Sequence, residues 1–138
     1  HFHLLLFQND PEAITALMRS VATGYVIYYN KRYKRTGSLF QGVYRAAKID
    51  NEGYWSHVAR YINLNPLDIG EDYRQYPYSS YQYYTGMQSA DWVTPDLGNP
   101  CETTADYARF VMDWLPYRYE AKELSSMLAN SREFTVQG

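Results

Sequence analysis

The sequence predicts an α+β protein that is rich in helices and contains a small antiparallel sheet. Two short segments, 1–7 and 38–48, have the apolar or alternating composition of strands. Several longer segments have apolar residues at helical spacing. With 138 residues, of which 46% are hydrophobic and 20% charged, the chain is long enough for one domain with an ordinary buried core.

The first helix is predicted directly after the first strand. Asp10 is a favourable N-cap, and Pro11 suits the first position of a helix. Apolar residues continue at helical spacing to about Tyr33. The pair Thr36-Gly37 is expected to stop the helix.

A second long helix is predicted in the middle of the chain. Either Asp50 or Asn51 is expected to cap it. It should end near Leu64 or Asn65, because Pro66 disfavours helical geometry in the residue before it. Further predicted helices are a short tyrosine-rich helix from Ser79-Ser80 to Gly86, a helix from Thr103 or Thr104 to about Leu115, and a last helix over 118–130.

Basic residues are concentrated in the first part of the chain. Residues 1–50 contain seven Lys or Arg and three Asp or Glu, whereas 51–138 contain six and twelve. A basic block beside aromatic residues is typical of a nucleic-acid-binding surface, and a solvated helix face is the alternative interpretation. The DNA-binding candidates are Lys31, Arg32, Lys34, Arg35, Arg45, Lys48, Tyr33 and Phe40, with Tyr29 and Tyr44 as further rings for stacking.

Two histidines, a tyrosine and an asparagine form the candidate catalytic set. His1 and His3 alternate along the first predicted strand, so both side chains project from one face. Tyr61 and Asn65 lie one turn apart on one face of the second long helix. Imidazoles and an amide oxygen can ligate a metal, and a tyrosine hydroxyl can attack a phosphate that the metal polarises.

Each of these residues also has a structural interpretation. Taken alone, Tyr61 is better explained as a half-buried aromatic residue beside Trp55. Taken alone, Asn65 is better explained as a helix cap ahead of Pro66. His57 lies one turn before Tyr61 and is either a possible accessory residue that contacts phosphate or a packing residue.

Four ordered motifs shift the balance toward chemistry. The motifs are His1-Phe2-His3-Leu4-Leu5-Leu6, Arg35-Thr36-Gly37-Ser38-Leu39-Phe40-Gln41-Gly42 with Tyr44-Arg45-Ala46, Ala59-Arg60-Tyr61-Ile62-Asn63-Leu64-Asn65-Pro66, and Gln75-Tyr76-Pro77-Tyr78-Ser79-Ser80-Tyr81. In this order they resemble the REP-associated tyrosine transposases, which belong to the HUH single-strand nucleases of the single-tyrosine transposase type. The resemblance covers about residues 1–86.

The resemblance implies a metal-dependent endonuclease and strand transferase that acts on single-stranded or hairpin DNA in transposition and recombination. Tyr61 would be the catalytic nucleophile, and it would form a 5′-phosphotyrosine intermediate and leave a 3′-hydroxyl. His1, His3 and Asn65 would hold Mg²⁺ or Mn²⁺. The wider family commonly has Gln at the position of Asn65.

The resemblance also implies a ferredoxin-like HUH nuclease fold that lacks its N-terminal strands. The chain begins at His1, without Met and inside the expected strand, so we expect a fragment of a longer protein. Residues 1–86 would be the N-terminally truncated catalytic domain. Residues 87–138 would be a C-terminal helical extension of the same domain. Without the missing strands, the fragment itself is expected to hold the metal face less well.

The remaining expectations concern partners and compartment. A single cysteine, Cys101, excludes an internal disulfide framework and fits a reducing compartment. No run of apolar residues is long enough to predict a membrane span. The resemblance implies a bacterial cytoplasmic, nucleoid-associated protein, and homodimers are common in the family.

Besides an active enzyme, the sequence is compatible with two other kinds of protein. The first is a catalytically inactive relative that binds hairpin or single-stranded DNA without cutting it. The second is a structural or interaction domain without a role in nucleic-acid binding, which the acidic composition of residues 51–138 favours.

Overall fold

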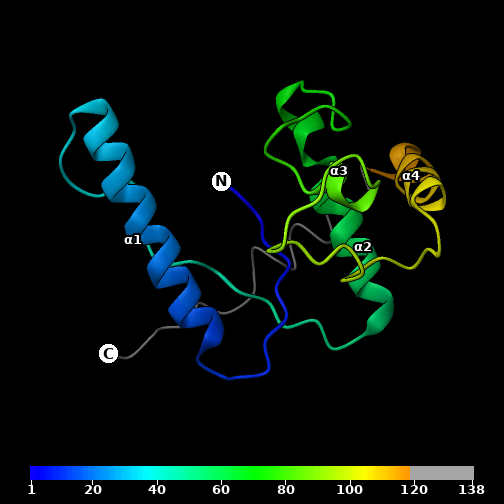
Figure 1. The fold of residues 1–138 in the computed structure, drawn as a ribbon, viewed down its shortest axis with the longest axis horizontal. Coiled ribbons are helices and arrows are strands. Elements are labelled where there is room, and N and C mark those ends of the chain that lie inside the picture. Colours follow the sequence, from blue (N-terminus) through cyan, green and yellow to red (C-terminus); the bar gives the residue numbers. More distant parts are fainter. Residues whose placement is uncertain (119–138) are drawn as a thin grey trace. The chain divides into compact units, whose positions relative to one another are not determined.

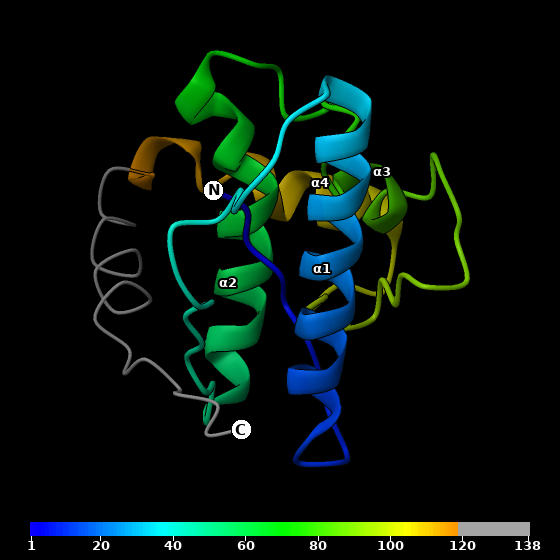
Figure 2. The same ribbon diagram turned by 90° about the vertical axis from the view of Figure 1, so that its left-hand side faces the viewer.

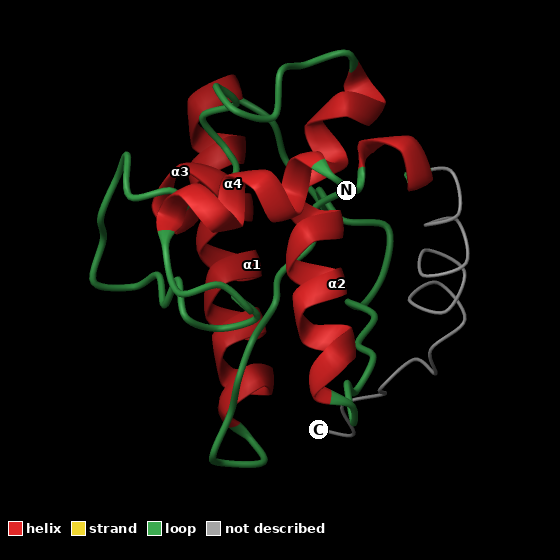
Figure 3. Ribbon diagram, turned by 90° about the vertical axis from the view of Figure 1, so that its right-hand side faces the viewer, coloured by secondary structure: helices red, strands yellow, loops and turns green. Residues whose placement is uncertain are grey.

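The computed structural model describes residues 1–118, and every regular element within them is helical (Figures 1 and 3). Two compact units divide the chain. Unit 1 contains residues 1–5 and, in its described part, 48–118, whereas unit 2 contains residues 6–47 in its described part. The elements are α1 (Ala13–Tyr33) in unit 2, and α2 (Glu52–Leu64), η1 (Asn65–Ile69), α3 (Tyr81–Tyr84), α4 (Thr104–Met112) and η2 (Leu115–Tyr117) in unit 1.

The predicted α+β class and the ferredoxin-like fold are wrong for the described residues. Neither 1–7 nor 38–48 forms a strand, and no sheet is present in residues 1–118. A strand requires a neighbouring strand to accept and donate its backbone hydrogen bonds. Both segments have a local composition that suits a strand, but the fold gives them no such neighbour within the described chain.

Helix α1 ends where the sequence predicts, but it begins later than predicted. It ends at Tyr33, and Lys34 follows in the left-handed conformation with φ of 52°. At the start, the Asp10 carboxylate accepts a hydrogen bond from the backbone N–H of Glu12 at 2.8 Å, so the first turn begins slightly later than predicted. In unit 2 this helix carries the buried Met18, and Thr15 contacts the Tyr44 hydroxyl at 3.5 Å.

Two helices of unit 1, α2 and α4, begin at predicted caps, whereas the side chain of Ser80 at the start of α3 makes no capping hydrogen bond. The side chain of Asn51 accepts the N–H of Gly53 at 2.8 Å and starts α2. The side chain of Thr103 accepts the N–H of Asp106 at 3.1 Å and starts α4. Both are N-cap interactions, in which a side-chain oxygen satisfies a backbone donor of the first turn. The predicted last helix over 118–130 lies almost entirely outside the described residues.

The core of unit 1 is built largely from tyrosines on α3, α4 and the loop that follows η1, and α2 contributes a leucine to it. In this core the rings of Tyr84 and Tyr107 stack with centroids 4.7 Å apart. Large buried aromatic residues contribute much apolar area, and each hydroxyl then needs a hydrogen-bond partner. The buried cluster contains Leu64, Tyr73, Tyr81, Tyr84, Tyr107 and Val111.

None of the helices in residues 1–118 is long and apolar enough to cross a lipid bilayer.

Candidate functional site

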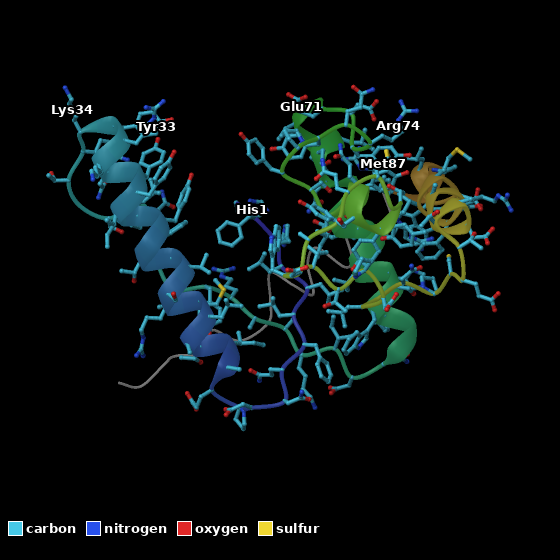
Figure 4. The ribbon with its side chains drawn as sticks, in the orientation of Figure 1. His1, Tyr33, Lys34, Glu71, Arg74 and Met87 are labelled. Atoms are coloured by element: carbon cyan, nitrogen blue, oxygen red, sulfur yellow. The ribbon has the colours of Figure 1, made fainter. Side chains whose placement is uncertain are left out.

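The structure brings His1, His3 and Tyr61 together within unit 1. The ring centroids of His1 and His3 are 4.9 Å apart, with planes at 84°. The ring centroids of His3 and Tyr61 are 5.8 Å apart, with planes at 72°. Figure 4 labels His1 at the start of the chain, and Figure 2 shows this first segment passing α2, which carries Tyr61. Residues from two distant parts of the sequence therefore share one small volume.

The side chain of Leu5 fixes the first segment against α2. A Cβ atom added at Gly98 would lie 3.0 Å from Leu5 Cδ2, Ala59 Cβ and the carbonyl oxygen of Trp55. Gly98 also has a φ of +75°, a conformation that glycine adopts without strain. The loop that contains Gly98 thus packs tightly against both Leu5 and α2, and this packing holds His3 beside Tyr61.

The half-buried imidazole of His3 is suited to ligate a metal. Its Nε2 atom is buried and has no hydrogen-bond partner among the described residues. Burial lowers the pKa of His3, and the positive amino terminus lowers it further, so the neutral ring is favoured. A neutral imidazole with an unused nitrogen is the form that binds a metal ion. His1 is exposed, and its ring can therefore adjust to the same ion.

The spacing of the two rings fits joint coordination. An imidazole nitrogen about 2.1 Å from a metal ion places the ring centroid roughly 3.2 Å from that ion, so two imidazoles on one ion have centroids about 4.5–5.2 Å apart. The observed 4.9 Å between His1 and His3 lies inside this range. Among residues 1–118, no three or more His, Cys, Asp or Glu side chains are grouped so that they could hold a metal ion, so a third protein ligand beside His1 and His3 would have to be of another type.

Asn65, at the end of α2, has a side chain of another type, an amide. Its backbone N–H bonds to the carbonyl of Ile62, and Pro66 follows it in η1, so the predicted capping role is observed. Its side chain is half-buried. It lies one helical turn beyond Tyr61. Capping and ligation are compatible, because the cap uses the backbone and leaves the amide oxygen available.

His57 has a defined partner that the sequence did not suggest. Its Nδ1 atom lies 2.7 Å from a terminal guanidinium nitrogen of Arg60, and its ring lies 5.5 Å from the ring of Trp114. Because arginine can only donate, Nδ1 accepts and the proton of the neutral ring is on Nε2. Burial lowers the pKa of His57, and the charge of Arg60 lowers it further.

Arg60 itself is buried between two aromatic rings. Its Cζ atom lies 4.2 Å from the Phe110 centroid and 4.0 Å from the Trp114 centroid, and a guanidinium N–H donates to the Phe110 carbonyl at 3.2 Å. These contacts fasten α2 to α4 and to the chain that follows it. An open depression of about 380 Å³ adjoins this cluster, and it is lined by Asn51, Gly53, Tyr54, His57 and Trp114. None of the predicted metal ligands lines that depression.

Asn63 is an important residue that sequence analysis missed. Its side-chain amide donates to the Tyr107 hydroxyl at 2.6 Å, and its carbonyl oxygen accepts from Ser80 at 3.1 Å and from Ser79 at 3.4 Å. Asn63 is completely buried. The sequence contained one indication of this buried role: Asn63 is a polar residue between Ile62 and Leu64 in a predicted helix, two residues after Tyr61. The Tyr-Ser-Ser-Tyr motif therefore serves here as the partner of α2.

The predicted DNA-binding residues belong mainly to unit 2. Lys31, Arg32, Lys34 and Arg35 are exposed at the end of α1 and just beyond it, and Figure 4 labels Tyr33 and Lys34 at this end. Arg45 is also exposed, and Phe40 is half-buried. Lys48 differs, because it belongs to unit 1 and pairs with Asp50 at 2.6 Å. Apart from Lys48, the DNA-binding candidates thus lie in unit 2, whereas the catalytic candidates lie in unit 1.

Compared with known proteins, the chain matches no family model, and neither a curated protein nor a solved structure matches it significantly. The resemblance of its four motifs to the REP-associated tyrosine transposases therefore stays a prediction from the sequence.

Proposed function

We propose that this chain carries the catalytic residues of a metal-dependent single-stranded DNA endonuclease and strand transferase of the REP-associated tyrosine transposase type. The proposal is supported above all by the proximity of His1, His3 and Tyr61. The ring centroids are 4.9 Å apart for His1 and His3 and 5.8 Å apart for His3 and Tyr61. A protein with this activity would act on DNA in the bacterial cytoplasm, in association with the nucleoid.

The residues present fit a divalent cation. His1, His3 and Asn65 would hold Mg²⁺ or Mn²⁺ through two imidazole nitrogens and an amide oxygen. When bound, the ion would polarise the scissile phosphate and stabilise its developing charge. The unpartnered Nε2 atom of His3 supports this assignment, because a buried nitrogen without a partner is costly unless a ligand satisfies it.

Tyr61 would attack the phosphorus atom through its hydroxyl oxygen. A bond forms between that oxygen and phosphorus, and the bond from phosphorus to the 3′-oxygen breaks. The tyrosine loses one proton and the departing 3′-oxygen gains one, which leaves a 5′-phosphotyrosine and a 3′-hydroxyl. The reverse attack by a 3′-hydroxyl would rejoin a strand without ATP, because the phosphodiester energy is kept in the tyrosine–DNA bond.

The test is formation of a covalent protein–DNA adduct. With Mn²⁺ and an end-labelled hairpin oligonucleotide, the wild-type chain should yield an adduct that survives denaturing electrophoresis, and Tyr61→Phe should yield none. Tyr54→Phe is the matched control, because Tyr54 lies on the same helix and is exposed. An adduct that persists in Tyr61→Phe, or its complete absence from the wild-type protein and from a longer form of the chain, would overturn the proposal.

A catalytically inactive DNA-binding relative is the second candidate. The exposed cations and rings at the end of α1 favour it, because they lie in unit 2 and do not depend on the histidine site. In that case, the wild-type chain and Tyr61→Phe would bind single-stranded DNA equally and neither would form an adduct. Absence of DNA binding at low salt would leave a structural or interaction domain.

A further inference from the structure

Three tyrosines form a continuous aromatic strip on α1. Tyr25, Tyr29 and Tyr33 follow one another at four-residue intervals, so they lie along one face of the helix. The centroids of Tyr25 and Tyr29 are 6.0 Å apart, and those of Tyr29 and Tyr33 are 4.5 Å apart. The outer two side chains are 48% and 59% exposed. We call these three residues the tyrosine row.

The chain beyond α1 turns back and adds a cation and a ring to the tyrosine row. The left-handed conformation of Lys34 allows the Arg35 N–H to bond to the Asn30 carbonyl at 2.9 Å. The Asn30 side chain then donates to the Gly37 carbonyl at 2.9 Å. As a result, the Arg35 guanidinium carbon lies 5.7 Å from the Tyr29 centroid. Further along, the Phe40 ring lies 6.4 Å from that of Tyr25.

Among the described residues, the charged side chains around the tyrosine row are basic. Lys31, Arg32 and Lys34 are exposed, and none of them forms an ion pair with a carboxylate in the described part of the chain. The sequence has no Asp or Glu between Glu12 and Asp50. An apolar protein partner would gain little from this uncompensated charge. A polyanion with accessible π faces matches both the cations and the rings.

We propose that the tyrosine row is a stacking platform for the unpaired bases of single-stranded DNA, with the flanking cations on the phosphate backbone. The inference rests on the proposed function for its choice of DNA, and it adds the part of the substrate that is recognised. Base pairs hide the faces of bases within a duplex, whereas an unpaired strand presents them. The tyrosine row therefore selects single strands over duplex, with little dependence on sequence.

The test measures binding separately from cleavage. Fluorescence anisotropy with a labelled oligothymidylate of about 12 nucleotides should use the Tyr61→Phe chain without divalent metal, so that no reaction occurs. Replacing both Tyr29 and Tyr33 by Leu should weaken binding by about fivefold or more per ring. Replacing both by Phe should keep most of the affinity, because the ring is retained. Tyr78→Leu is the control, because Tyr78 is highly exposed but belongs to unit 1.

Several outcomes would overturn the inference. Equal affinity for single strands and for a duplex of the same length would indicate recognition of charge alone. Equal losses for the Leu and Phe variants would exclude stacking, provided that circular dichroism shows both variants folded. A change in self-association of the Leu variant, without an effect on DNA binding, would instead indicate a protein interface.

The two proposals fail in distinguishable ways. If the ring-dependent binding is observed but the wild-type chain forms no covalent adduct with Mn²⁺, only the nuclease proposal fails. If the adduct forms but binding does not depend on the rings, only the stacking platform fails.

Discussion

At the scale of single residues, Asn63 connects three segments of unit 1. It bonds to Tyr107 on α4 and to Ser79 and Ser80 ahead of α3, and it does so in complete burial. Buried polar groups of this kind are costly when a partner is lost. The amide of Asn63, together with the contacts of Arg60, therefore fixes the position of α2, and with it that of Tyr61.

We predict that Asn63→Ala lowers the free energy of unfolding by about 1–3 kcal/mol, because it leaves the Tyr107 hydroxyl without its partner. Urea unfolding of Asn63→Ala, Tyr107→Phe and the double variant measures the coupling. The double variant should lose less than the two single variants together. Strictly additive losses would mean that the 2.6 Å contact between these residues contributes no stability.

The pair of His57 and Arg60 makes unit 1 sensitive to acid. The pKa of His57 is lowered in the folded protein, so the folded state binds fewer protons than the unfolded state below about pH 6.5. The contribution of His57 to the free energy of unfolding should therefore be constant above that pH. It should decrease as the pH falls below it. Protonation would also replace an accepting nitrogen with a positive charge beside the Arg60 guanidinium.

Thermal unfolding at about pH 7.5 and about pH 5.5 tests this dependence. The wild-type melting temperature should be lower at the acidic pH, and His57→Gln should show a smaller difference. His3→Gln serves as the comparison, because burial also lowers the pKa of His3 and contributes with the same sign. A wild-type melting temperature that does not fall on acidification would contradict the prediction.

At the scale of elements, the contact between the first segment and α2 decides whether the histidines meet Tyr61. Gly98 lies at this contact, with no room for a side chain beside Leu5 and Ala59. Gly70 has a similar φ of +78°, but nothing lies within 4 Å of an added Cβ there. Alanine substitutions at Gly98 and at Gly70 would impose similar backbone strain, but only the one at Gly98 would also disturb packing. Comparing them therefore separates the two effects.

We predict that Gly98→Ala destabilises the protein by about 1–3 kcal/mol more than Gly70→Ala, because only the former forces atoms apart. Urea unfolding measures the difference. Equal losses would mean that Leu5 moves away from α2 without cost. In that case the proximity of His3 and Tyr61 would not depend on this packing.

Most helices could be predicted from the sequence, whereas the predicted sheet is wrong for the described residues. The caps at Asn51 and Thr103 and the end of α1 at Tyr33 use residues close in sequence, so local chemistry is sufficient to identify them. A sheet requires a distant partner, and nothing local to 38–48 reveals that residues 1–118 contain no partner strand. The ring of His3 lies beside that of Tyr61, but the catalytic roles inferred from the motifs stay predictions, and the roles of Asn63 and Arg60 required the packing of α2 against α4.

At the scale of the whole molecule, the two units differ in charge and in chemistry. In unit 2, the described residues have six basic and two acidic side chains. In unit 1, the described residues have five basic and ten acidic ones. If the chain binds DNA as proposed, the electrostatic attraction should act mainly through unit 2 and should weaken as salt is added. The reacting groups proposed for the chain belong to unit 1, so capture and reaction can be altered separately.

The tyrosine core of unit 1 has a consequence for tolerance of alkali. Burial raises the pKa of Tyr84 to about 12 and raises the pKa of Tyr107 further. In an unfolded chain these phenols ionise near pH 10. The folded state thus holds protons that the unfolded state releases, and stability declines as the pH rises above that value. A core made of tyrosines packs as other aromatic cores do. Its hydroxyls ionise, however, so its stability has an upper limit in pH that a core of leucine and phenylalanine lacks.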